Sequence, residues 1–261
     1  MISMSSKKSS KLSGKILVPG DKSISHRALI LGSLVSGKIK IYNLLESDDV
    51  IATAEALKKL GIKINKLDNV WEIFGNGIGN LFVSNVELDM GNSGTGSRLI
   101  MGLIAGSDAE ATILGDESLS KRPMKRIISP LLKTGATFDD PNNDHLPLKI
   151  KGSKIPLPIE YISPVASAQI KSSILLAGLS STGNTTVIEP ALSRDHTERM
   201  LNYLGADVST KKLSNSSWKI MLKGLPNLKP YDIEVPSDPS SAAFPIVASL
   251  ITPNSRIKVL N

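Results

Sequence analysis

Hydrophobic and polar positions follow a pattern that recurs along the whole chain. In each recurrence a cluster of small polar residues precedes an apolar run of helical length, and a β-branched run follows it. Equivalent positions in the four β-branched runs lie 72, 74 and 72 residues apart, at Ile41, Ile113, Val187 and Val259. A near-constant spacing of this kind indicates a repeated supersecondary unit.

The first three recurrences share a second half, in which another helix ends and further strands follow. Gly61, Gly135 and Gly205 occupy the position at which a glycine commonly ends a helix. Asn76-Gly77 predicts a hairpin in the first recurrence. Each full unit is therefore predicted to be βαβαββ, and the fold class to be α/β (α+β) with repeated units.

The two ends of the chain differ from the three full units. The fourth recurrence has no second half, because the sequence stops at Asn261, so we expect a truncated fold. Residues 1–14 contain Lys7, Lys8 and Lys11 among serines, and we expect them to form a disordered leader. This stretch lacks the apolar core of a signal peptide.

The composition narrows the classes of partner. Lys and Arg number 31 against 24 Asp and Glu, and the net charge of +7 favours anionic partners. Aromatic residues make up only 4%, which disfavours single-stranded nucleic acid, since its binding depends on stacking. The longest apolar run, residues 99–105, is far shorter than the roughly 20 residues that span a bilayer. The absence of cysteine excludes thiolate metal sites and fits a reducing cytosol.

The predicted helix starts carry the candidate chemistry. The first turn of a helix presents free N–H groups and the positive end of the helix dipole, which together bind anions. Stacked repeats should bring several such starts, with their cations, to one cleft. Gly94 at one start would let the backbone approach a ligand closely. The cations near the helix starts are Lys22, Arg27, Arg98, Arg122, Lys171 and Arg194.

Other candidate sites are weaker. The three histidines lack the i, i+4 spacing of a metal pair, so we expect no metal site. Glu46, Asp48 and Asp49 are expected to cap a helix and to pair with arginines. No carboxylate or lysine stands out as a tuned acid or base.

The segments that carry these features resemble the EPSP synthase family, the 3-phosphoshikimate 1-carboxyvinyltransferases. The matching segments are PGDKSISHR (19–27), GNSGTGSR (91–98), LSKRPM (119–124), SAQIKS (167–172) and SRDHTE (193–198). The resemblance implies an enolpyruvyl transferase-like fold of two domains, each with three βαβαββ units, joined by two crossing strands. On that basis residues 15–22 form the first strand and crossover of a split domain. Residues 23–235 form a complete three-repeat domain, and residues 236–261 begin the other domain.

The resemblance also implies a reaction and its binding residues. The enolpyruvyl group of phosphoenolpyruvate would pass to the 5-hydroxyl of shikimate 3-phosphate, on the shikimate pathway to chorismate and aromatic amino acids. No metal or redox cofactor would take part. Shikimate 3-phosphate would bind Lys22, Ser23, Arg27, Ser167, Ala168, Gln169 and Arg194. Phosphoenolpyruvate would bind Lys22, Gly94, Arg122 and Gln169.

The resemblance places the proton-transfer residues beyond Asn261. No catalytic residue is therefore assigned, and residues 1–261 alone are expected to be inactive. The family also implies a cytoplasmic monomer without nucleic-acid or membrane partners.

Three alternatives remain open. A UDP-sugar enolpyruvyl transferase usually has a reactive cysteine, which this chain lacks. A basic nucleic-acid-binding module, related to the RNA-phosphate cyclases by its repeat, has no motif in its favour. The third alternative is a non-catalytic, anion-binding fragment.

Overall fold

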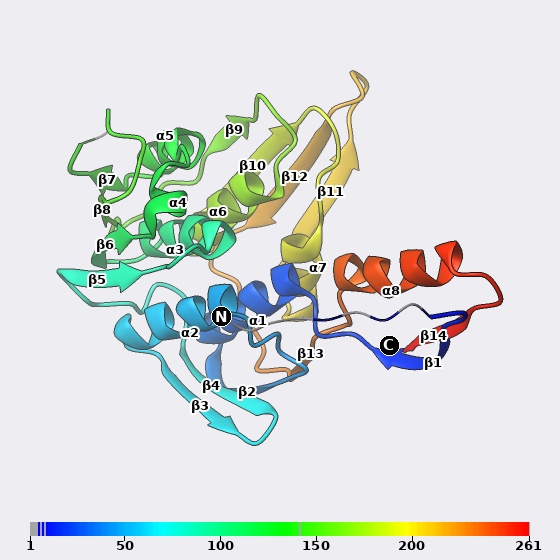
Figure 1. Ribbon diagram of the computed structural model, residues 1–261. Coiled ribbons are helices and arrows are strands. Elements are labelled where there is room, and N and C mark those ends of the chain that lie inside the picture. The colour runs from blue at the N-terminus through cyan, green and yellow to red at the C-terminus, as the bar shows by residue number, and fades with distance from the viewer. Residues whose placement is uncertain (1–4, 6, 8, 141, 261) are drawn as a thin grey trace.

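The computed structural model describes residues 5, 7, 9–140 and 142–260. Their strands form three four-stranded sheets and one two-stranded sheet. Figure 1 shows helices from the three larger units side by side between the sheets, and their apolar faces share one hydrophobic core. The predicted class, α/β with repeated units, is confirmed.

The second and third units are continuous in sequence. The second unit comprises β5 (Val86–Asp89), α3 (Gly94–Ala105), β6 (Glu110–Leu114), α4 (Glu117–Ser120), α5 (Lys125–Lys133), β7 (Thr137–Phe138) and β8 (Leu148–Lys151). The third comprises β9 (Glu160–Ile162), α6 (Ala168–Gly178), β10 (Asn184–Glu189), α7 (His196–Tyr203), β11 (Val208–Lys212) and β12 (Trp218–Lys223). Their strand orders, β5-β6-β8-β7 and β9-β10-β12-β11, are equivalent.

The first unit takes its leading strand from a distant part of the chain. It contains α1 (Lys22–Leu34), β2 (Ser36–Tyr42), α2 (Asp48–Lys59), β3 (Lys63–Leu67) and β4 (Val70–Asn76). Its leading strand is β13 (Ile233–Glu234), which follows the third unit and pairs parallel with β2. In the three sheets Ile41, Ile113 and Val187 each face a residue of the leading strand, so these positions are structurally equivalent.

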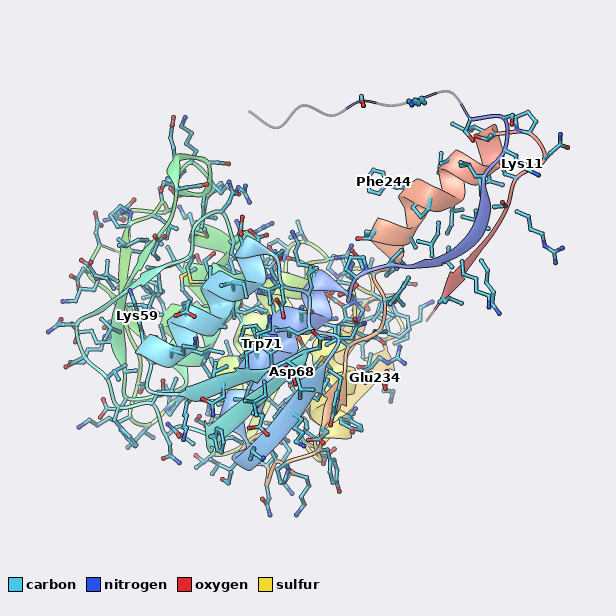
Figure 2. All side chains as sticks on the ribbon, turned by 60° about the horizontal axis from the view of Figure 1, so that its bottom comes forward. Lys11, Lys59, Asp68, Trp71, Glu234 and Phe244 are labelled. Atoms are coloured by element: carbon cyan, nitrogen blue, oxygen red, sulfur yellow. The ribbon has the colours of Figure 1, made fainter. Side chains whose placement is uncertain are left out.

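The fourth recurrence forms a separate pair of strands. β1 (Ser13–Leu17) pairs parallel with β14 (Arg256–Leu260), and α8 (Pro239–Ile251) precedes β14. Figure 2 shows this group projecting from the rest of the molecule, with Phe244 on α8. The side chain of Phe244 is 79% exposed. The division of the chain at residues 23 and 235 stays a prediction.

Two local predictions need correction. The expected leader ends earlier than residue 14, because Ser13 and Gly14 already pair with β14; residues 1–4, 6 and 8 of it lie outside the described residues. The hairpin does not lie at Asn76-Gly77, since Asn76 is the last residue of β4. The turn lies instead at residues 68–69, between β3 and β4, where Asp68 has a φ of 53°.

Glycines act at two kinds of position. Gly61, Gly135 and Gly205 have φ values of 89°, 96° and 92°, a left-handed conformation that ends a helix without strain, as predicted. Gly102 serves packing: a Cβ there would lie 2.5 Å from the backbone oxygen of Ser173. α3 and α6 therefore pack backbone against backbone, which brings their first turns close together.

Candidate anion-binding site

Side chains cap the helices that open toward the candidate site. The carboxylate of Asp21 accepts from the Ile24 N–H of α1 at 2.8 Å. Ser93 caps α3 and Ser167 caps α6 through their hydroxyls. The caps fix where each helix begins, and the positive dipole end at each start favours a nearby anion.

Arg27 links three helices. Its Nε donates to Thr197 Oγ1 on α7 at 2.7 Å, and its Nη2 donates to Ser172 Oγ on α6 at 2.8 Å. Its Nη1 donates to the backbone oxygen of Ser23 at 2.9 Å. Burial lowers the pKa of Arg27 to about 10, with Glu198 opposing the shift, so the group stays charged at neutral pH. The guanidinium has more N–H donors than these three bonds use, and the remainder can bind an anion.

Gln169 is the centre of a second network. Its Oε1 accepts from Arg98 Nη1 and from Arg126 Nη2, both at 3.1 Å. Its Nε2 donates to Thr95 Oγ1 at 3.1 Å. The two arginines and Thr95 thus fix the orientation of the amide.

The two networks adjoin on α6. Gln169 and Ser172 are three residues apart in one helix, so their Cβ atoms lie about 5–6 Å apart on the same face. Ser23, whose backbone oxygen accepts from Arg27, lines a hollow of about 1000 Å³ together with Lys22 and Arg194. A second hollow of about 660 Å³ is lined by Arg98 and Arg122, among others. Arg27 connects the first hollow to α6 through Ser172, and Gln169 on α6 connects to the second through Arg98.

The remaining predicted residues lie at the starts of α6 and α3. Ser167 and Ala168 form the start of α6 and are half-buried. Gly94 begins α3, and a Cβ there would lie 3.0 Å from Arg122 Nη1 and 3.1 Å from Arg98 Nη1. Gly94 thus allows the two guanidiniums to sit against the backbone.

The positive charge of the second hollow is concentrated. Desolvation lowers the pKa of Arg98 to about 10, and the nearby Arg126 and Arg122 add to the shift. Arg126 and Thr95 were not among the predicted residues. The second arginine of KRPMKR was the available signal for Arg126.

The acidic residues near the site have lysine partners, which corrects the expected pairing with arginines. Asp49 pairs with Lys22 at 3.0 Å, and Glu46 pairs with Lys66 at 2.6 Å. Lys22 is 49% exposed, so its ion pair is weak enough for an incoming phosphate to replace Asp49.

Lys171 is not a cleft cation, although it was expected among them. Its side chain is fully buried, with Nζ 3.0 Å from Glu189 Oε1 and 2.6 Å from Glu198 Oε1. Two residues after Gln169, it lies about 200° around the helix and therefore points away from Gln169.

His26 makes folding stability sensitive to pH. Its ring is fully buried, with Nδ1 2.8 Å from Thr53 Oγ1, and desolvation lowers its pKa from 6.5 to about 4. Between pH 6.5 and about pH 4, His26 is protonated in the unfolded chain but stays neutral in the folded chain. This contribution to stability is therefore complete above pH 6.5 and is lost as the pH falls toward 4. Its full size is about 3 kcal/mol.

We therefore expect wild-type protein to lose more stability than His26→Gln when the pH falls from 7 to 4.5. Urea unfolding at several pH values measures the two free energies of unfolding. Parallel pH profiles for the two proteins would refute a buried neutral His26.

Across the described part of the chain, no group of three or more His, Cys, Asp or Glu side chains could hold a metal ion. Nor does any helix among residues 9–140 and 142–260 have the length and apolar character needed to cross a membrane.

Comparison with known proteins agrees with the resemblance. The family profile described as EPSP synthase (3-phosphoshikimate 1-carboxyvinyltransferase) matches residues 6–261. The chain belongs to the EPSP synthase family. This membership favours the predicted family over the UDP-sugar enolpyruvyl transferases.

Members of the EPSP synthase family match this chain over nearly all of its length. A 3-phosphoshikimate 1-carboxyvinyltransferase of Parvibaculum lavamentivorans is 53% identical over 258 residues, which cover 98% of this chain and 57% of the relative. One from Bartonella henselae is 51% identical over 260 residues, which make up 59% of that relative. The EPSP synthase structure of Acinetobacter baumannii has a TM-score of 0.85 at 42% identity, covering 95% of this chain and 55% of that one. The chain thus spans little more than half the length of these relatives.

Proposed function

We propose that this protein serves the transfer of the enolpyruvyl group from phosphoenolpyruvate to the 5-hydroxyl of shikimate 3-phosphate, with release of phosphate. The observation that carries the proposal is that two networks meet on one face of α6, where Arg27 donates to Ser172 and Arg98 donates to Gln169. Two polyanionic substrates repel each other, so a site that joins them needs dense, preorganised positive charge.

The two substrates are assigned to the two networks. Shikimate 3-phosphate lies against Arg27 and Arg194, with Lys22, Ser23 and the start of α6 completing its site. Phosphoenolpyruvate lies against Arg122 and the backbone at Gly94, with Lys22 and Gln169 between the two ligands. Arginine grips a phosphate or carboxylate with two parallel hydrogen bonds, which suits both substrates. The proposed reaction uses no metal or redox cofactor.

Isothermal titration calorimetry of the purified chain with shikimate 3-phosphate tests this assignment. We expect saturable heat that weakens as salt is added, since the contacts are ionic. A folded chain that gives no heat would contradict the placement of this binding site within residues 1–261.

The expected inactivity of residues 1–261 alone stays a prediction. Incubation of the chain with both substrates should release no phosphate above the rate without protein. Any reproducible enolpyruvyl transfer would refute it.

We also propose that the protein acts in the cytosol as a monomer. Its lack of cysteine suits a reducing compartment. Light scattering across a concentration series would measure the oligomeric state, and a mass that rises with concentration would contradict the proposal.

Gly94→Ala is expected to weaken phosphoenolpyruvate binding about tenfold. The new Cβ would stand within 3.1 Å of the Nη1 atoms of Arg98 and Arg122, and both guanidiniums must move to relieve the contact. Competition calorimetry measures the affinity, with Glu117→Ala on the exposed surface of α4 as the control. Unchanged affinity for Gly94→Ala would mean that these guanidiniums do not set the binding geometry.

A further inference from the structure

A buried ionic cluster lies behind the candidate cleft. The side chains of Lys171, Glu189 and Glu198 are 0%, 1% and 4% exposed, and they come from α6, the end of β10 and α7. The ammonium of Lys171 contacts both carboxylates, at 3.0 and 2.6 Å. None of the three is assigned to ligand binding.

Glu189 connects the cluster to Arg194. Its Oε1 accepts from the backbone N–H of Ser193 at 2.9 Å, and its Oε2 accepts from the Ser193 hydroxyl at 2.7 Å. Arg194 is the next residue and lines the larger hollow. A carboxylate that holds the backbone at Ser193 therefore sets where the side chain of Arg194 starts.

Glu198 connects the cluster to Arg27. The ion pair of Lys171 with Glu198 lies beside a second contact between the same two helices. Ser172, which follows Lys171, and Thr197, which precedes Glu198, are joined by a hydrogen bond of 2.7 Å. Both hydroxyls accept from Arg27. The ion pair and the hydroxyl pair thus fix α6 against α7 at the place where Arg27 is bound.

We propose that Lys171 is a positioning residue for the anion cleft. It holds Glu189 and Glu198 in place, and through them it fixes the positions of the Arg194 and Arg27 side chains. A purely stabilising role explains the cluster less well, because apolar residues of similar volume commonly stabilise a core as well as a buried ion pair does. The cluster has two branches, and each branch ends on one cleft arginine. The positioning of the two arginines by the cluster does not depend on any ligand. The expected effect of the cluster on ligand affinity rests on the proposed function.

Two near-isosteric variants test the branches separately. Solvent exchange of the Arg27 Nε–H and of the Ser193 backbone N–H can be measured by ¹H–¹⁵N NMR without any ligand. Glu198→Gln should speed exchange at Arg27 at least tenfold and leave Ser193 within twofold. Glu189→Gln should do the reverse. A cluster that only adds stability would lower the melting temperature without this division between the branches.

The variant Lys171→Met/Glu198→Gln tests the role of Lys171, which both branches share. It removes one charge of each sign, so the net charge of the cluster does not change. Both exchange rates should rise at least tenfold, and affinity for shikimate 3-phosphate should fall at least tenfold. The matched control is Lys58→Met/Glu55→Gln, an exposed lysine–glutamate pair on α2, which should change neither rate by more than twofold.

The outcomes separate this inference from the proposed function. Rates that stay within twofold in folded variants would overturn the positioning role, even if wild-type protein binds shikimate 3-phosphate. The expected exchange pattern without any binding by wild type would overturn the proposed function and leave the positioning role intact. If the double variant does not fold, the two single variants decide.

Discussion

Replacing Arg27 by alanine should reduce the affinity for shikimate 3-phosphate about 30-fold or more. Its guanidinium is 4% exposed and already oriented by three hydrogen bonds, so it meets a phosphate without reorganisation. Removing one partner of a buried, hydrogen-bonded charge pair costs about 2–5 kcal/mol, which is about 30-fold or more in affinity. Calorimetric titration of both proteins measures the difference.

Two further variants make the Arg27 result specific. Arg256→Ala removes an exposed arginine on β14 and should bind like wild type. Arg27→Lys keeps the charge but loses the two-pronged geometry, so its affinity should lie between wild type and Arg27→Ala. An affinity of folded Arg27→Ala within threefold of wild type would remove Arg27 from the site.

The second large effect concerns stability. Lys171→Met should lower the free energy of unfolding by about 3–5 kcal/mol, because it leaves the buried carboxylates of Glu189 and Glu198 without their cation. Desolvation already raises the pKa of Glu198 with Lys171 present. Total stabilities of domains are only about 5–15 kcal/mol, so this single change removes a large share.

Urea unfolding followed by circular dichroism measures this loss. Lys58→Met disrupts an exposed ion pair and should cost less than about 1 kcal/mol. A loss below about 1 kcal/mol for Lys171→Met as well would show that the cluster tolerates an unpaired charge, which would contradict its buried ionic character.

The repeated units and their helix starts were predictable because both depend on residues that are close together in the sequence. Apolar runs, small polar caps and helix-ending glycines each act within a few residues, and their regular spacing indicated the unit. The leading strand of the first unit was not predictable in this way. β13 has only two residues, and its partner strand lies 192 residues earlier, so no local pattern marks the pairing.

The site was predictable to the level of motifs but not of side-chain direction. Arg27, Arg122 and Gln169 were expected near ligands. Arg122 lines one hollow, and the other two hydrogen-bond to residues that line a hollow. Lys171 belongs to the same motif as Gln169 yet points into the core, because rotation along the helix separates the two side chains. Its partners come from β10 and α7, and only the tertiary fold brings them together.

The pairing of β13 with β2 also sets an order of events during synthesis. All strands of the second unit lie between residues 86 and 151, so its sheet can close as soon as that stretch leaves the ribosome. The sheet of the first unit is complete only after Glu234 has been synthesised, 158 residues after Asn76 ends β4. At about 5–20 residues per second the delay is roughly 8–30 s. During that interval one edge of β2 is open to chaperones or to mispairing.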